Sequence, residues 1–564
     1  MSRRVFGGLL VLCMMVSLLV GCSDEPQIPE MPEDSALQAL VTEQETQTDD
    51  EALPEESQAP NTPGRFAMPY NASYGWDPYN CTCMENIAVM QLIYEGLFTL
   101  NSSYDAENVL CTGYEVSENG MMYTLQLRDA KFSNGQKLTA EDVVYSMSLA
   151  QSSTVYGSRL SDVGGFSADG DSTVIIYMSN PNDRLPCLLT FPIVPSGSSF
   201  NAPLGTGPFV KGDGVLTQNA SWWKGVGNLQ FDQVTLYSSI SAEDTRDSFE
   251  IDKVHFVYND PIASTAATFH CDYELWNSGG TVMQYLVFNR SSGIFQDDNV
   301  RTAITYAIDR GEIAEELYHN FADAASLPVA PASSMYNETL ANRYNYDPSE
   351  ANSRLRTSAS FVMPGDTDAL TEETDTEAEE AAEPPEEEPL NPEEDAAGTE
   401  EGSALEEENE ITYNNIKMIV RSGSLIRTNT AKAVAEDLEN LGFTVELVTL
   451  GYDEFRYTIT TGEYDIYFEE VSLRPDFDLR PLFEYAGDLN YTAFSMDEEM
   501  SELFTHALEN SGNRYDLYQH IMDNAYICPI LFRNNAVFTT RGVFTGLDPS
   551  PDNLFYNIEN ISVK

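Results

Sequence analysis

The segment GMMYTLQLRDAKFSNGQKLTAEDVVYSMSLA, residues 120–150, predicts a strand, a turn and a helix in direct succession. Its first part alternates apolar with polar residues, as a half-buried strand does, and the apolar positions are Met121, Tyr123, Leu125 and Leu127. Ser-Asn-Gly at residues 133–135 is typical of a turn. Thr139, with Asp142 three residues later, has the pattern of a capping box at the start of a helix.

Two later segments show a similar mixture of periodicities. In residues 294–318, apolar residues form one helical stripe, at Val300, Ala303, Ile304, Ala307 and Ile308. Asp309 is then placed to cap a further helix. Residues 416–470 alternate strand and helix patterns in the order βαβαβ, which predicts a parallel sheet with right-handed crossovers. A ligand crevice is expected beyond the carboxyl ends of these strands.

The N-terminus has the features of an export signal that ends in a lipidated cysteine. Arg3 and Arg4 precede an apolar run of about 16 residues, which is shorter than the roughly 20 residues that a membrane-spanning helix needs. The run ends in Leu-Val-Gly-Cys, which resembles the lipobox of bacterial lipoproteins. The resemblance implies that residues 1–21 are removed and that Cys22 carries fatty acyl chains such as palmitate, which anchor the chain to the membrane. The alternative is a buried apolar segment with a chance cysteine.

Acidic residues are concentrated in two segments of low complexity. The chain has 91 acidic and 29 basic residues, a formal net charge of −62. Residues 22–63 are predicted to be a disordered acidic stalk, because they contain few large apolar side chains. Residues 360–411 are predicted to be a disordered acidic insert, in which residues 366–410 include 21 acidic side chains and no Lys or Arg. The acidic excess argues against nucleic-acid binding, which requires clustered basic residues.

The spacing of cysteines and histidines indicates neither a metal site nor a catalytic site. Apart from Cys13 and Cys22, the cysteines are Cys81, Cys83, Cys111, Cys187, Cys271 and Cys528. This even number permits disulfides, whose pairing the sequence leaves open. Cys81 and Cys83 are one residue apart rather than the two that are usual for zinc ligands. The five histidines are scattered, and no H-E-x-x-H or G-x-S-x-G motif is present, so we expect neither an enzyme nor a cofactor.

Five segments, in order along the chain, resemble the extracytoplasmic solute-binding proteins of family 5, the oligopeptide- and dipeptide-binding lipoproteins of ABC importers. They are LIYEGLFTL (92–100), YEVSENGMMYTLQLRDAKFSNGQKLTAEDVVYS (114–146), PLGTGPF (203–209), YLVFNRSSGIFQDDNVRTAITYAIDR (285–310) and YDPSEANSRL (346–355). Two features depart from the family pattern. Val-Leu-Cys-Thr stands at residues 109–112, where the family often has Pro-x-Leu-Ala, and the acidic insert replaces a much shorter connection.

The resemblance implies an α/β fold of the two-lobed, periplasmic-binding-protein type (class II) with an additional small domain. Lobe I would contain residues 64–90, 203–284 and 533–564, the appended domain II residues 91–202, and lobe III residues 285–532. Two strands would cross between the lobes, near residues 285–290 and 528–538. Proteins of this type close around a ligand and carry out no bond chemistry.

The resemblance also implies where a peptide would be held. Peptide-binding members place a carboxylate against the ligand ammonium, because an unpaired buried charge is costly. Asp476 fits this role best by position and Asp478 second, although either could instead be a capping or surface residue. Arg474 could pair with these acids or with a ligand carboxylate. Further candidates for the cleft, with core packing as the alternative for the aromatic residues, are Asn289, Trp76, Tyr70, Tyr285 and Phe288.

The resulting expectation is a monomeric, lipid-anchored protein on the extracytoplasmic face of a bacterial cell membrane. It would capture oligopeptides or dipeptides and deliver them to a permease with separate ATPase subunits, because the chain has no membrane span after Val20 and no phosphate-binding loop with its lysine. Three alternatives stay open. One is a receptor for a nickel chelate, haem or another solute. The second is an adhesin or sensor that uses the acidic insert as a contact surface, and the third is a surface hydrolase.

Overall fold

The structure is a computed structural model that describes residues 64–263, 266–291, 293–364, 414–484, 487, 489–491 and 496–564. The predicted export signal with Cys22, the predicted stalk, and residues 365–413 of the predicted insert lie outside the described residues. Phe361 and Met363, at the start of that insert, are buried in a hydrophobic cluster, so the packed chain extends beyond residue 360. In the described part of the chain, no helix is both long enough and apolar enough to cross a membrane.

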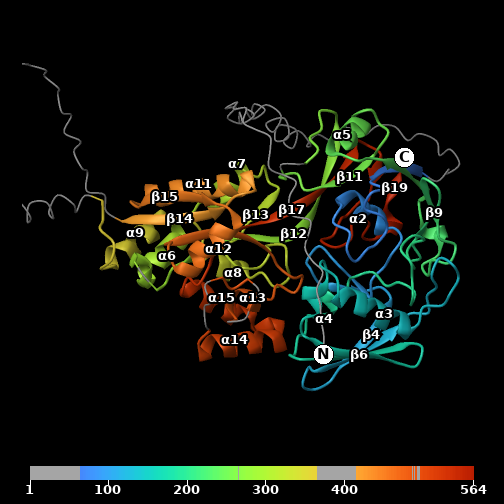
Figure 1. The fold of residues 1–564 in the computed structure, drawn as a ribbon, viewed down its shortest axis with the longest axis horizontal. Coiled ribbons are helices and arrows are strands. Elements are labelled where there is room, and N and C mark those ends of the chain that lie inside the picture. The colour runs from blue at the N-terminus through green and yellow to red at the C-terminus, as the bar shows by residue number, and fades with distance from the viewer. Residues whose placement is uncertain are drawn as a thin grey trace, which may run out of the picture. The chain divides into compact units, whose positions relative to one another are not determined.

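The predicted βαβαβ unit forms part of a seven-stranded sheet (Figure 1). Its elements are β14 (Asn415–Arg421), α11 (Leu425–Asn440), β15 (Thr444–Leu450), α12 (Tyr452–Thr461) and β16 (Ile466–Ser472). β14 pairs in parallel with both β15 and β16, which confirms the predicted parallel arrangement. Because β14 lies between the other two strands, right-handed crossovers place α11 and α12 on opposite faces of the sheet.

Alternate residues of β14 contribute to the packing on the two faces. Met418 and Val420 belong to the same buried cluster as Val434 of α11. Ile419 points the other way and shares a cluster with Phe455 of α12. All five side chains are fully buried. Helices therefore cover this parallel part of the sheet on both faces, which explains why its strands are apolar nearly throughout.

Two long antiparallel strands complete the sheet beyond β16. β12 (Tyr273–Phe288) pairs with β16 and with β17 (Cys528–Thr540). β17 also pairs with β11 (Phe256–Asn259) and with β13 (Ala322–Ala324). The register between β12 and β17 shifts between Asn277 and Val282. Gly279 has a φ of 70° at this irregularity, a conformation that glycine adopts without steric cost.

A second sheet contains β1 (Gly64–Tyr70), β10 (Phe231–Ser238), β9 (Val215–Gln218) and β8 (Phe209–Lys211), in that order. β1 and β10 are parallel, and the other neighbours are antiparallel. The PLGTGPF segment leads into β8. Its Gly205 passes so close to the backbone of Ile93 that an added Cβ would lie 1.9 Å from the Ile93 carbonyl oxygen. Gly207 makes a similar approach, so the packing itself requires glycine in this segment.

The segment of residues 120–150 forms the strand, turn and helix that its sequence predicts. β5 (Met122–Leu127) lies in an antiparallel sheet with β4 (Cys111–Val116), β7 (Thr173–Met178) and β6 (Val163–Asp169). α3 (Ala140–Gln151) follows. The backbone N–H of Thr139 donates to Oδ2 of Asp142 at 2.8 Å, which confirms the predicted capping box.

The remaining elements connect these sheets. The helices are α2 (Met84–Met90), η2 (Gly157–Leu160), α4 (Leu185–Leu188), η3 (Val226–Asn228), α5 (Ala242–Glu250), η4 (Gly293–Gln296), α6 (Asp298–Ala307), α7 (Arg310–Glu316), α8 (Glu338–Ala341), α9 (Pro348–Thr357), α13 (Arg480–Phe483), α14 (Glu498–Glu509), η5 (Ser511–Asn513), α15 (Arg514–Asp523) and η6 (Ile558–Asn560). The short strands are β2 (Phe98–Leu100), β3 (Ala106–Asn108), β18 (Phe544–Thr545) and β19 (Ser562–Val563). Asp309 caps α7 as predicted, because its carboxylate accepts from the N–H of Glu312. The six cysteines of the described residues are free thiols.

Candidate functional site

A cavity of about 270 Å³ lies at the carboxyl end of β16, where the sequence predicts a crevice. Its lining residues are Leu100, Val155, Ser158, Arg159, Asp260, Gly280, Thr281, Val282, Ser472, Leu473, Arg474, Pro475, Arg533, Asn535, Pro551 and Asp552. Residues 472–475 follow β16 directly, and residues 280–282 belong to the irregular part of β12. We call this space the central cavity. Its walls come from segments that lie hundreds of residues apart in the chain.

A second cavity, of about 330 Å³, shares one wall with the central cavity. The residues that line both are Val155, Arg159, Pro551 and Asp552. We call this second space the flanking cavity. Glu95 lines it and accepts hydrogen bonds from the indole N–H groups of Trp222 and Trp223, both at 3.1 Å. Burial raises the pKa of Glu95 above its ordinary value.

Of the five charged residues around the central cavity, three are paired inside the protein. Arg533 forms ion pairs with Asp260 and, at 2.8 Å, with Glu470. Arg474 is held by the two aspartates that follow it in the sequence. These side chains are therefore neutralised before any ligand arrives.

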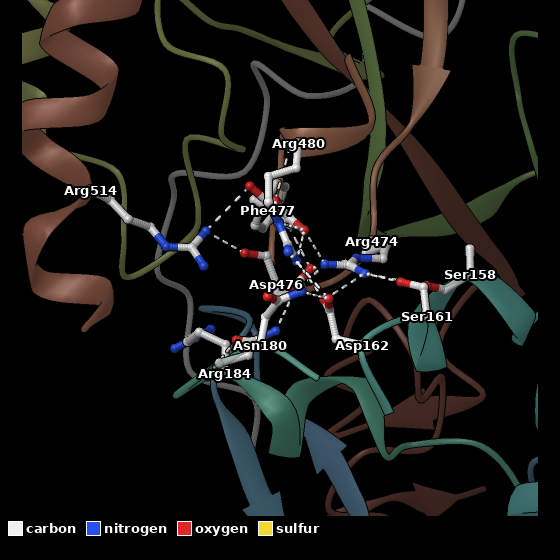
Figure 2. Close-up of polar contacts among 12 residues, drawn as sticks. Ser158, Ser161, Asp162, Asn180, Arg184, Arg474, Asp476, Phe477, Arg480 and Arg514 are labelled. Carbon is white, nitrogen blue, oxygen red and sulfur yellow. Dashed lines mark hydrogen bonds and ion pairs between the residues drawn. The ribbon is translucent and has the colours of Figure 1, made fainter. Parts of the chain in front are cut away.

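Arg474 belongs to a buried ion cluster that joins residues 158–182 to residues 474–514, as Figure 2 shows. The members of this ion cluster are Asp162, Asn180, Asn182, Arg474, Asp476, Asp478, Arg480 and Arg514. Arg474 binds Asp476 through two parallel hydrogen bonds, from Nε to Oδ1 at 3.2 Å and from Nη2 to Oδ2 at 3.1 Å. Arg480 binds Asp478, with Nε 2.9 Å from Oδ2. Arg480 also donates through Nη1 to Oδ1 of Asp162 at 3.2 Å, across 318 residues of sequence.

The ion cluster stabilises the ionised form of its own carboxylates. Burial by itself would raise the pKa of Asp476, but Arg474 and Arg514 lower it below its ordinary value. Burial opposes ionisation of Asp162 in the same way, and Arg480 again makes the net pKa shift downward. Three aspartates face three arginines, so the charges balance within the cluster. An arginine paired in two directions also fixes the geometry of its neighbours.

Acid should therefore destabilise the protein through this cluster. Asp162 and Asp476 stabilise the folded state above their ordinary pKa of 3.8, and that contribution is lost as the pH falls below this value through their lowered pKa values. We expect the free energy of unfolding, measured with urea, to fall as the pH is lowered from about 5 to about 3. Asp162→Asn should show a shallower decline, and an equal slope in the variant would contradict this explanation.

The two predicted partners of a ligand ammonium, Asp476 and Asp478, lie inside the ion cluster. Their exposed fractions are 0% and 5%, and neither lines the central cavity. Arg474, predicted with them, does line it. The structure thus brings the three residues together, as predicted, but the two carboxylates face arginines of the protein.

Three other predicted residues, Tyr285, Phe288 and Asn289, line a separate pocket of about 370 Å³. The Asn289 side-chain amide donates to the carbonyl oxygen of Tyr464 at 2.9 Å, so it holds the chain that follows β12 against the start of β16. Tyr285 is 1% exposed, and burial raises its pKa well above the ordinary value.

The last two predicted residues, Tyr70 and Trp76, stack on each other with ring centres 4.5 Å apart. Trp76 is buried, and the ammonium of Lys211 lies 5.4 Å from its ring centre. Neither ring lines the central cavity, the flanking cavity or the pocket beside Tyr285. Their arrangement agrees with the core-packing alternative.

Sequence reasoning did not single out four charged residues of the central cavity, which are Arg159, Asp260, Arg533 and Asp552. Arg159 lies in the short helix η2, and Asp552 lies in a turn near the C-terminus. No local pattern marks either residue, because only the fold brings them together. Arg533 had a usable signal, since it lies within residues 528–538, where a crossing strand is expected.

Residues 105–383 match the family model described as bacterial extracellular solute-binding proteins, family 5 Middle. The chain belongs to this family. As a family 5 solute-binding protein, it is 27% identical over 304 residues to the glutathione-binding protein GsiB of Escherichia coli (strain K12). That match covers 50% of this chain and 58% of the relative, so the chain spans little more than half the length of this curated protein.

Solved structures of substrate-binding proteins share the fold. The ABC transporter substrate-binding protein CtaP of Listeria monocytogenes matches with a TM-score of 0.64 at 17% identity, covering 89% of this chain and 99% of that one. The oligopeptide-binding protein AppA of Bacillus subtilis, in complex with a nonapeptide, matches with a TM-score of 0.54 at 18% identity and coverages of 89% and 100%. A nickel ABC transporter protein of Bacillus halodurans gives 0.65 at 16% identity and the same coverages. These likenesses confirm the predicted α/β, two-lobed periplasmic-binding-protein fold.

Proposed function

We propose that this family 5 protein is the substrate-binding subunit of an ABC importer, and that it captures oligopeptides or dipeptides in the central cavity. The observation that carries the proposal is the position of this cavity at the carboxyl end of β16, beside β12 and β17. Ligands of open α/β sheets bind at this edge. A ligand that touches walls from separate segments can favour a closed state over an open one, which is the signal a permease would need.

The choice of peptides as ligands is supported by the relatives. One structure of similar fold holds a nonapeptide, and the curated relative is named for glutathione, which is itself a tripeptide. The chemistry expected of the protein is reversible binding without turnover. Transport and ATP hydrolysis would belong to a membrane permease and to ATPase subunits, to which this chain would deliver its ligand as a monomer.

The proposal places the protein on the extracytoplasmic face of the cell membrane. Cys22 would carry the lipid anchor, and the acidic stalk of residues 22–63 would connect it to the folded part. Mass spectrometry of the chain purified from its host membranes should find an acylated cysteine at the mature N-terminus. A chain that retains residues 1–21, without acyl groups, would contradict the anchor.

Native mass spectrometry of the gently purified protein tests the ligand. We expect a bound peptide whose mass is released on unfolding. Val282→Trp should abolish its retention, because Val282 lines the central cavity and an indole would fill it. Thr124→Trp, on β5 of a different sheet, is the matched control and should retain the peptide. A metal chelate in place of a peptide, or equal retention by both variants, would contradict the proposal.

A further inference from the structure

We infer that Arg159 and Asp552 together bind the opposite charges of a zwitterionic ligand, which makes free peptide termini the feature that this protein recognises. The inference rests on the proposed function and deepens it. Arg159 would receive the ligand carboxylate and Asp552 the ligand ammonium. Both residues line the wall that the central cavity shares with the flanking cavity.

The first observation is that the Arg159 guanidinium has no acidic partner among the residues that the structure describes. Its Nη1 donates to Oγ1 of Thr190 at 2.9 Å, and the group lies 4.9 Å from the ring centre of Tyr156. Both neighbours are uncharged. A guanidinium presents two parallel N–H donors, which suit a carboxylate. Arg159 therefore has unused capacity for an anionic group that enters the cavity.

The second observation is that Asp552 has no basic partner within ion-pair distance in the described part of the chain. Its Oδ1 accepts from the backbone N–H of Leu100 at 2.9 Å and from the hydroxyl of Ser550 at 3.3 Å. Burial raises the pKa of Asp552 to about 6, although the hydrogen bond from Leu100 and the charge of Arg159 act in the opposite direction. The protein thus maintains a carboxylate whose ionised form lacks a counterion.

These two residues differ from the other charged residues of the same cavity. Arg474, Asp260 and Arg533 all have ionic partners inside the protein. Desolvating a charge without a partner is costly, so an unpaired pair of opposite sign is expected where a ligand completes the site. One zwitterion would supply both missing partners at once. The charge of Arg159 already influences Asp552, which shows that the two groups act on the same space.

The shared wall also suggests how a peptide would lie. Its charged termini would bind at the wall, and its side chains would extend into the central or the flanking cavity. Aromatic residues that line the flanking cavity, among them Tyr94, Tyr156 and Trp222, offer apolar surface to such a side chain. Aromatic rings beside a charged anchor favour ligands that combine both chemistries.

Binding of three peptide pools tests the inference. The pools contain the same synthetic dipeptides and tripeptides, either with free termini, with acetylated N-termini, or with amidated C-termini. We expect native mass spectrometry and calorimetry to show binding of the free pool, with acetylation and amidation each weakening it on the order of 10- to 100-fold. Asp552→Asn should lose the preference against acetylation only, and Arg159→Gln the preference against amidation only.

Controls separate this inference from the proposed function. Glu107→Gln removes a carboxylate of the flanking cavity that does not reach the central cavity, and it should leave all three affinities unchanged. Asp552→Asn keeps a side-chain oxygen to accept from Leu100, and thermal unfolding should show a midpoint no lower than that of the unmodified protein. Equal binding of all three pools would overturn the inference alone. Failure to bind any pool would overturn the proposed function with it.

Affinity for the free pool should also fall as the pH is lowered through about 6, the raised pKa of Asp552. Protonation removes the charge that an ammonium would bind, whereas the ammonium itself stays charged over this range. The charged or titratable groups that face the two cavities around Asp552 are Glu95, Glu107, Tyr156, Arg159, Lys224, Asp260, Arg474 and Arg533. Burial raises the pKa of Glu95 as well. Asp552→Asn should therefore remove the pH dependence, and Glu95→Gln should not.

Discussion

Arg480→Ala should lower the free energy of unfolding by about 3–5 kcal/mol, the usual cost of removing one partner from a buried ion pair. The guanidinium is 10% exposed and contacts both Asp162 and Asp478. Burial by itself would lower the pKa of Arg480, but its bonds with Asp478 and Asp162 raise it above the ordinary value. Alanine would leave these carboxylates in a desolvated site without that partner. Urea denaturation at neutral pH, monitored by circular dichroism, measures the loss.

Two comparisons make this prediction specific to the ion cluster. Arg65→Ala breaks an exposed ion pair with Asp232 and should leave the denaturation midpoint nearly unchanged. The double variant Arg480→Ala/Asp162→Asn should lose less stability than the sum of its single variants, because the second change removes a charge that the first left unpaired. A loss for Arg480→Ala as small as that for Arg65→Ala would show that the cluster contributes little to stability.

Gly205→Ala should lower the free energy of unfolding by about 3 kcal/mol or more, at the upper end of what overpacking costs. The new methyl group would lie 1.9 Å from the carbonyl oxygen of Ile93, and a backbone atom cannot move aside as a flexible side chain can. Ile93 is itself fully buried. Relief would require separating the two backbone segments, which would disturb the entry of the chain into β8. Thermal and urea unfolding both measure the effect.

Gly113→Ala is the matched control for this substitution. Gly113 lies in β4, and nothing lies within 4 Å of a Cβ added there. Alanine loses less conformational entropy than glycine on folding, so this variant should be as stable as the unmodified protein or slightly more stable. If both glycine variants unfold at the same denaturant concentration, the close approach to Ile93 does not constrain this part of the fold.

The sequence predicts the elements of this fold well wherever a short pattern determines them. The alternation in residues 121–127 forms β5, the pair of Thr139 and Asp142 starts α3, and the βαβαβ order of residues 416–470 gives parallel pairing. In each case the signal and the interaction lie within a few residues or within one repeated unit. The irregular register of β12 against β17 was not predictable in this way, because it depends on pairing between residues about 250 apart.

The candidate site was less predictable, because the partners of its charges come from distant segments. Asp476 is a reasonable ammonium partner until Asn182 and Arg514 are seen to bind it together with Arg474. Asp552 is an ordinary turn residue until the fold places it on the wall of two cavities. A sequence shows which residues carry charge. Only the three-dimensional structure shows which of those charges are already neutralised.

The distribution of indole rings determines what optical experiments on this protein will report. All four tryptophans, Trp76, Trp222, Trp223 and Trp276, precede residue 285, and the βαβαβ unit and the ion cluster contain none. Fluorescence emission at indole wavelengths therefore follows the stacked Trp76 and the Trp222–Trp223 pair beside Glu95. Melting of the βαβαβ unit is visible only to probes of the whole backbone. Superimposable curves from the two kinds of probe would indicate that both regions unfold as one cooperative unit.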